Sequence, residues 1–311
     1  MKYKIISMVV AIAILAGWIY FSGPEKILEN ILRADYRFLL LGIVISTGLV
    51  ALRVYRWQFL LKRSGIKLGF FDVAPSFMAG LLISNLTPGK IGEPARNLFL
   101  SRSKSVPITE SISTVILERA VDIISIMIFS VLGILTYGIF IAKSGTTIAA
   151  VVSIYIAGIA AVFFLASSKN RMNKIFSIFP FNRVIKDPQK ASEAISKSFN
   201  SLKDWNLVLP LLGMSLLVWF IEAIILYLAF SSLGADVPFM FLLSAFCIAI
   251  LASILSSLPG GIGSMEVILT FFITAVVSIP VSTISSAILL ERLIALWYNL
   301  LLGAISFKFL K

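Results

Sequence analysis

One motif occurs twice in this chain and limits how the chain can fold. The first copy contains Pro88-Gly89 and the second contains Pro259-Gly260, and in both an isoleucine, a glycine and a glutamate follow. Each copy is followed, at nearly equal spacing, by a Glu-Arg pair in an apolar stretch; these residues are Glu118, Arg119, Glu291 and Arg292. Pro and Gly interrupt a helix. The duplication therefore predicts two halves, each built around a helix broken at a Pro-Gly hinge.

The composition indicates a membrane protein. Of 311 residues, 59% are hydrophobic and 14% are charged, whereas a soluble domain has about 25% charged residues. The chain has no histidine, and Cys247 is its single cysteine. This excludes histidine chemistry and a Cys-x-x-Cys site. We expect the basic residues behind the net charge of +12 to set the orientation in the membrane and to attract anionic lipid, and we do not expect nucleic-acid binding. We expect no enzymatic activity, no metal and no cofactor.

The apolar runs predict an all-α integral membrane protein with about six full spans and two re-entrant hairpins. The spans are expected at residues 5–21, 38–52, 107–142, 146–166, 207–233 and 283–307. The hairpins are expected at 71–101 and 237–280, because most of their arms are shorter than the hydrocarbon core of about 30 Å. The arm at 237–258 is long enough to cross, so an alternative with eight full spans stays open.

The basic residues predict the orientation and the division of the chain. Most of the 27 Lys and Arg residues fall on one side of the membrane when both termini are cytoplasmic. We expect a first membrane repeat at 1–166, a basic amphipathic cytoplasmic elbow at 167–206 and a second repeat at 207–311, all in the cell membrane. The two hairpins then enter from opposite sides. This inverted-repeat topology is typical of secondary transporters.

Ionisable residues within the apolar stretches are the first candidates for a substrate site. Glu118 and Asp122 share one helix face, next to Arg119, and the second Glu-Arg pair repeats most of this pattern. A charge at mid-membrane costs about 2.5–3.5 kcal/mol, so such residues need a partner or a wet cavity. In one interpretation each arginine pairs with a hairpin glutamate, and in the other the groups line a cavity that admits a lipid headgroup or couples to an ion. The two hairpin glutamates are Glu93 and Glu266. Both interpretations are compatible.

The helices that follow the hinges supply further candidates. The free N–H groups and the positive dipole end of a helix N-terminus suit a phosphate. Asn85, Lys90 and Arg96 surround the first hinge and are expected to contribute to substrate binding. In the alternative interpretation, Glu93 and Glu266 cap these N-termini as first-turn acids.

A basic cluster follows the predicted span at 38–52. We interpret its residues as topology signals and interface anchors, and alternatively as a patch that collects anionic headgroups; they are Arg53, Arg56, Trp57, Lys62 and Arg63. Glu222 is isolated in its span. We expect it to hydrogen-bond within the bundle, with a proton relay as the alternative.

These residues resemble a known membrane family. The residues around the two hinges and the two Glu-Arg pairs are similar to the lysylphosphatidylglycerol synthetase transmembrane region, also called the flippase-like or YbhN-like family. In the first half the resemblance rests on Asn85, Pro88, Gly89, Ile91, Gly92, Glu93, Arg96, Glu118, Arg119 and Asp122. In the second half it rests on Leu258 to Gly263, Glu266, Glu291, Arg292, Leu293 and Trp297. The resemblance covers roughly residues 5–308 and implies lipid translocation without naming the lipid.

The expected function is translocation of an anionic lipid, either a phospholipid or a polyprenyl-phosphate-linked lipid, between the two leaflets. The main alternative is a non-transporting membrane partner of a glycosyltransferase or lipid synthase. A lipid transferase and a transporter of small polar solutes are less favoured. The expected partners are the anionic lipid, such an enzyme, and a second copy of the chain in a homodimer.

Overall fold

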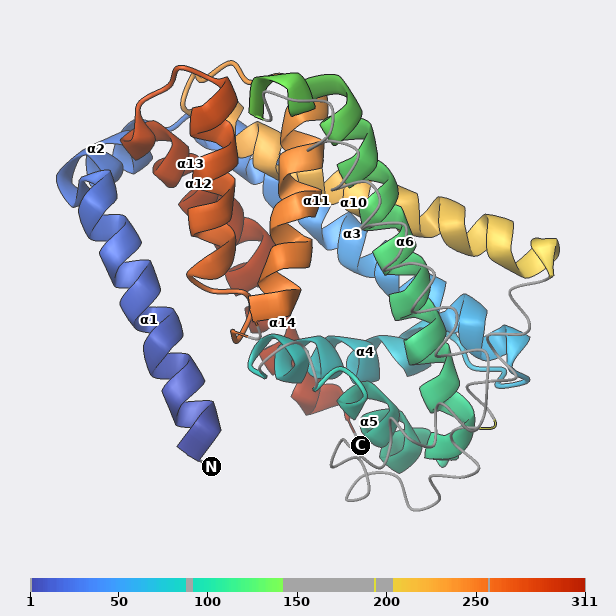
Figure 1. Cartoon of the computed structure of the whole chain (residues 1–311). Helices are drawn as coiled ribbons and strands as arrows, with labels where there is room; N and C mark the ends of the chain where they lie inside the picture. The colour runs from blue at the N-terminus through green and yellow to red at the C-terminus, as the bar shows by residue number, and fades with distance from the viewer. Residues whose placement is uncertain (1, 88–91, 142–192, 194–203, 257, 311) are drawn as a thin grey trace.

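The computed structural model describes residues 2–87, 92–141, 193, 204–256 and 258–310, which form helices joined by short loops (Figure 1). This confirms the all-α class. The α-helices are α1 (Lys2–Ser22), α2 (Pro24–Arg33), α3 (Tyr36–Arg63), α4 (Phe70–Asn85), α5 (Ala95–Lys104), α6 (Ile108–Ile141), α10 (Trp205–Ser232), α11 (Phe239–Ser256), α12 (Ser264–Val276), α13 (Val281–Arg292) and α14 (Tyr298–Ser306). A π-helical segment, Leu293–Trp297, joins α13 to α14.

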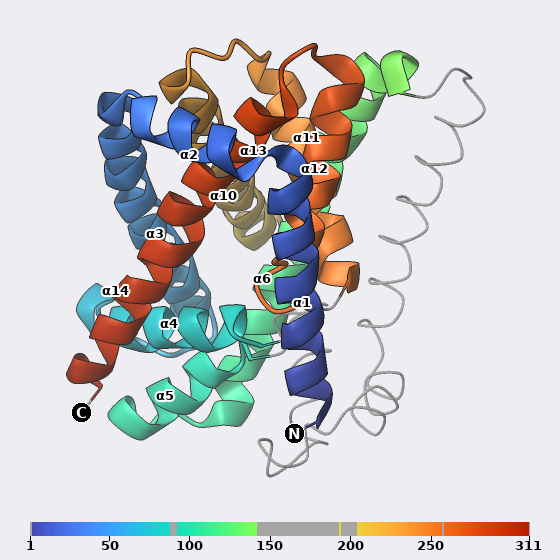
Figure 2. The same ribbon diagram turned by 90° about the vertical axis from the view of Figure 1, so that its left-hand side faces the viewer.

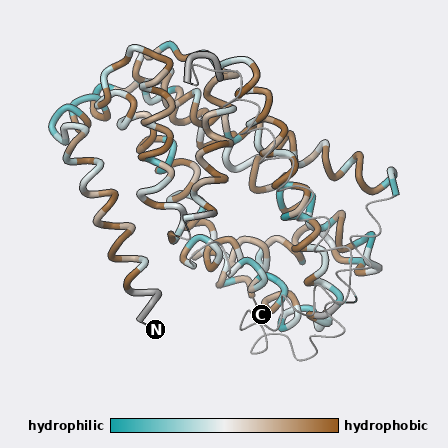
Figure 3. The backbone as a smooth tube through the Cα atoms, in the orientation of Figure 1, coloured by the Kyte–Doolittle hydropathy of each residue, from teal (hydrophilic) through white to brown (hydrophobic). Residues whose placement is uncertain are grey.

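Several described helices are long and apolar enough to cross a membrane. They are Tyr36–Arg63, Glu110–Tyr137, Trp205–Ser232 and Val281–Phe309, and α1 and α2 add one more if this pair, bent by 81°, forms one span. Hydrophobic residues dominate these helices in Figure 3. Four predicted spans are thus confirmed, at 38–52, 107–142, 207–233 and 283–307. The run at 5–21 lies in α1, and the run at 146–166 lies outside the described residues. The protein is a multi-pass membrane protein.

The second span is longer than predicted. The sequence suggests that it ends at Leu52, before the basic cluster, but α3 continues to Arg63. Arg53 and Arg56 therefore lie within the helix and face the bundle. They can do so because acidic side chains of other helices pair with them.

Each Pro-Gly region separates two short helices. α4 has 16 residues, about 24 Å, and packs beside α5, while α11 packs beside α12. Figures 1 and 2 show α4 and α5 lying across one end of the longer helices. The two turns meet, because a Cβ built on Gly260 would lie 3.3 Å from the carbonyl oxygen of Asn85. The hinge residues Pro88 and Gly89 lie outside the described residues, as does almost all of the elbow predicted at 167–206.

The two halves pack against each other through several helix pairs. α3 packs on α10, α6 on α11, and α4 on α14. One large apolar cluster is contributed mainly by α10 to α13 and includes Phe246 and Leu269, both at most 2% exposed. The ionisable residues of both halves are consequently brought to one central region.

We expect Gly80→Ala to lower the free energy of unfolding by about 1–3 kcal/mol, the usual cost of overpacking. Gly80 is buried where α4 meets α5, and an added Cβ would lie 2.4 Å from Cβ of Arg96 and 2.9 Å from its backbone nitrogen. Gly48→Ala on α3 is the matched control, because its Cβ would meet nothing within 4 Å. Thermal unfolding in one detergent compares the two variants. Equal midpoints would contradict the close packing of α4 on α5.

Candidate functional site

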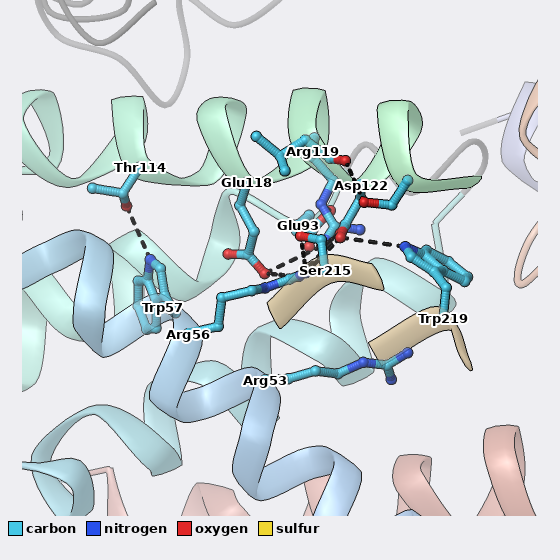
Figure 4. A network of polar contacts seen from close by, with 12 residues as sticks. Arg53, Arg56, Trp57, Glu93, Thr114, Glu118, Arg119, Asp122, Ser215 and Trp219 are labelled. Carbon is cyan, nitrogen blue, oxygen red and sulfur yellow. Dashed lines mark hydrogen bonds and ion pairs between the residues drawn. The ribbon is translucent and has the colours of Figure 1, made fainter. Parts of the chain in front are cut away.

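Arg56 on α3 is the centre of a buried ion-pair network. Its guanidinium donates hydrogen bonds to Asp122 at 2.5 and 3.0 Å, to Glu118 at 2.6 Å and to the Ser215 hydroxyl at 2.7 Å (Figure 4). Trp219 donates a further bond to Asp122 at 3.3 Å. The side chains of Arg56, Glu118 and Asp122 are at most 3% exposed. One guanidinium thus ties α3 to α6 and α10.

Two more arginines connect the first pair of short helices to α6. Arg96 on α5 donates to the second oxygen of Glu118 at 2.6 Å. Arg119 on α6 lies 2.5 Å from Asp122 and 3.2 Å from Glu93, which belongs to the turn before α5. We call the Arg119–Glu93 ion pair the first latch, because it holds this turn against α6. It is one of the two pairs that the sequence predicts.

The second pair of short helices has an equivalent contact. Nε of Arg292 on α13 donates to Glu266 on α12 at 2.7 Å, and this is the second predicted pair. We call it the second latch. The other oxygen of Glu266 accepts a bond from the Gly263 N–H at 2.7 Å, so Glu266 also caps α12. Nη2 of Arg292 and Oε2 of Glu291 are buried without a hydrogen-bond partner among the described residues.

A polar cavity lies between the two latches. Its volume is about 80 Å³, which is room for about five water molecules. Arg53 on α3 and Glu222 on α10 form an ion pair in its wall. Asn85 and Gly260, which lie at the two hinge turns, also line the cavity. The ionisable side chains that line it are Arg53, Glu93, Arg119, Asp122, Glu222, Glu291 and Arg292. Both halves of the chain therefore contribute charge to one cavity.

The guanidinium groups of the cavity wall can recognise an anion when they leave the carboxylates with which they pair. Three arginines line the cavity, and a guanidinium fork matches a phosphate or a carboxylate. Among the described residues, no group of three acidic or cysteine side chains is arranged to hold a metal ion.

A match to a family model shows the family of the chain. A family model described as the lysylphosphatidylglycerol synthase TM region matches residues 8–303. The chain belongs to this family. The match spans both Pro-Gly motifs and both Glu-Arg pairs, and it confirms the resemblance found in the sequence.

Archaeal relatives are similar to this chain along almost their whole length. A UPF0104 membrane protein of Methanothermobacter thermautotrophicus is 27% identical, covering 99% of this chain and 96% of the relative. One of Pyrococcus horikoshii is 28% identical, covering 98% and 96%. A third, of Methanocaldococcus jannaschii, is 30% identical over 73% of this chain and 93% of the relative. These names state a membrane location and no substrate.

In this member of the lysylphosphatidylglycerol synthase TM family, the residues predicted for substrate binding gather in one region. Arg56, Arg96, Glu118 and Glu266 are buried in the networks beside the cavity and do not line it. Lys90 lies outside the described residues. The remaining predicted residues line the cavity, and they are Arg53, Asn85, Glu93, Arg119, Asp122, Glu291 and Arg292.

The interpretation of Arg56 and Trp57 as interface anchors is wrong. Arg56 is 1% exposed and Trp57 is not exposed at all. The indole of Trp57 donates to Thr114 on α6 at 3.0 Å, and its ring lies 4.7 Å from the guanidinium carbon of Arg96. Both side chains can lie in the core because groups of α5, α6 and α10 pair with them.

Sequence reasoning missed several polar residues of the cavity. Ser84, Ser253 and Asn299 line it, and Oδ1 of Asn299 is buried without a hydrogen-bond partner in the described part of the chain. Each is a small polar residue in an apolar helix, which is common in membrane proteins and therefore a weak signal. In the sequence Glu222 is isolated in its span and Arg53 belongs to a separate basic cluster; the fold brings the two together.

Proposed function

We propose that this protein moves an anionic lipid between the two leaflets of the cell membrane. The observation that carries the proposal is the cavity between the two hinge turns, lined by Arg53, Arg119 and Arg292. The planar fork of a guanidinium matches the phosphate of a lipid headgroup. The lipid is either a phospholipid or a polyprenyl-phosphate-linked lipid, and its hydrocarbon chains stay in the membrane.

Membership of the lysylphosphatidylglycerol synthase TM family supports this proposal. The family name connects the chain to a membrane region that occurs with the synthesis of a charged phospholipid. Two features of the fold add support: paired short helices in each half, and turns that meet at the cavity. We propose that they form inverted repeats with both termini in the cytoplasm, as the distribution of basic residues predicts.

Transport requires that the cavity opens. Its volume of about 80 Å³ accommodates a few waters. The two latches each hold one pair of short helices against a long helix, so opening one latch at a time would expose the cavity to one leaflet at a time. In this scheme an incoming headgroup competes with Glu93 or Glu266 for its arginine.

We expect purified protein in liposomes to speed the leaflet exchange of fluorescent phosphatidylglycerol well above that of phosphatidylcholine. A membrane-impermeant quencher measures the exchange, and the same panel includes a short polyprenyl phosphate. The matched control, Lys62→Met, removes an exposed cation of α3 and should behave as the unmodified protein. Exchange at the rate of protein-free liposomes for every anionic probe would contradict the proposal.

One observation favours the second candidate, a membrane partner of a glycosyltransferase or lipid synthase. The buried network leaves little open space between the halves. Copurification with such an enzyme from native membranes, together with no exchange of any probe, would support this candidate instead. Two predictions stay untested: the chain has no enzymatic activity of its own, and it forms a homodimer.

A further inference from the structure

Glu291 differs from the other acidic side chains around the cavity. It is 1% exposed, it lines the cavity, and its Oε2 has no hydrogen-bond partner among the described residues. Its neighbour Arg292 forms no ion pair with it among the described residues. Arg292 instead donates to Glu266. Glu291 is therefore a buried carboxyl group without an ion pair in the described part of the chain.

The charge balance of the region points to a proton on this group. Among the residues that the structure describes, the cavity and its neighbouring networks contain five arginines: Arg53, Arg56, Arg96, Arg119 and Arg292. They contain six carboxyl groups: Glu93, Glu118, Asp122, Glu222, Glu266 and Glu291. Each of the first five carboxylates has an arginine within ion-pair distance. Neutralising Glu291 makes the region electrically balanced, as a bilayer interior favours.

The charged groups that face Glu291 come from the surrounding helices. Glu266 on α12 and Glu222 on α10 are nearby carboxylates, and Arg292 is the nearby cation on its own helix. Arg53 on α3 pairs with Glu222 in the same wall, and Arg119, Glu93 and Asp122 line the rest of the cavity. An ionised Glu291 would thus lie near two like charges. It would also be a new partner for the unpaired Nη2 of Arg292, in competition with Glu266.

We propose that Glu291 is an exchangeable proton site that links lipid movement to a proton gradient. The inference rests on the proposed function. A proton from water in the cavity binds Oε2 and forms a neutral carboxylic acid, and its release returns it to water. When the proton leaves, Glu291 attracts Arg292 and weakens the second latch. The absence of histidine in the chain leaves carboxyl groups as the candidates for such a site.

The proton site is tested first without lipid transport. Infrared difference spectra of the protein in lipid, recorded across a pH change, should show loss of a carboxylic-acid C=O band. We expect the band in the unmodified protein and in Glu110→Gln, which removes an exposed acid of α6, and not in Glu291→Gln. Persistence of the band in Glu291→Gln would overturn the assignment. If Glu291→Gln does not fold, Glu291→Asp replaces it, and an unshifted band would overturn the assignment.

The link to transport is tested with a pH gradient across liposomes. With one proton per lipid, a gradient of one pH unit should shift the steady-state leaflet ratio of labelled phosphatidylglycerol by up to about tenfold. Glu291→Gln should move lipid without this shift. If the leaflet ratio of the unmodified protein does not change with the pH gradient, the link to protons is overturned, whereas the proposal of lipid movement is unaffected. If the infrared band is observed but no lipid probe moves, the proton site is supported and the proposed function is contradicted. A shift that disappears when N-methylglucamine replaces sodium would assign the coupling to sodium and overturn the proton link.

Discussion

Replacing Arg56 with Met should destabilise the protein by about 3–5 kcal/mol, the cost of removing one partner from a buried ion pair. Arg56 lies between Glu118 and Asp122, and all three side chains are at most 3% exposed. Without it, the hydroxyl of Ser215 loses a donor, and Asp122 keeps Arg119 and Trp219 as its partners among the described residues. The measurements are the thermal unfolding midpoint in detergent and the yield of monodisperse protein.

Two variants make this result specific to the network. Lys62→Met removes an exposed cation from the same helix and should leave the midpoint nearly unchanged. Arg56→Met combined with Asp122→Asn removes one charge of each sign and should recover part of the loss, because fewer carboxylates remain uncompensated. If Arg56→Met unfolds at the midpoint of Lys62→Met, then Arg56 does not hold α3 to α6 and α10.

The local features of the fold could be predicted from the sequence because they depend on residues that are close together along the chain. The Pro-Gly breaks mark the two pairs of short helices, and in one of the two interpretations of the Glu-Arg pairs each arginine pairs with the glutamate of its hairpin. The contacts Arg119–Glu93 and Arg292–Glu266 confirm that inference. Both contacts join segments that are close along the chain.

The long-range part of the site could not be predicted. Arg53 and Glu222 are 169 positions apart, and Arg56 and Ser215 are 159 apart. Nothing near Arg56 in the sequence supplies a negative charge, so the sequence predicts a membrane boundary where this arginine follows an apolar run. The counter-charges come from α6 and α10, and only the packing of α3 against them shows that the helix continues with its arginines inside.

Replacing Arg119 with Met should abolish most transport of anionic lipid while the protein stays folded. Of the five arginines in the region, Arg119 has the most accessible side chain, 34% exposed, and it lines the cavity. It can therefore leave Glu93 and Asp122 to bind a headgroup. A hydrogen bond to a charged group contributes about 1.5–3 kcal/mol, so the exchange rate of phosphatidylglycerol should fall by about 10–100-fold. The rate of phosphatidylcholine exchange should change far less.

A matched variant separates headgroup binding from the first latch. Glu93→Gln also breaks the Arg119–Glu93 ion pair but keeps the cation, so it should retain or raise the rate for phosphatidylglycerol. The charge reversal Glu93→Arg with Arg119→Glu restores an ion pair but moves the cation from α6 to the hinge turn. If the reversal restores transport and Glu93→Gln abolishes it, the ion pair itself is required. If Arg119→Met and the reversal are both slow and Glu93→Gln is active, Arg119 binds the lipid anion directly.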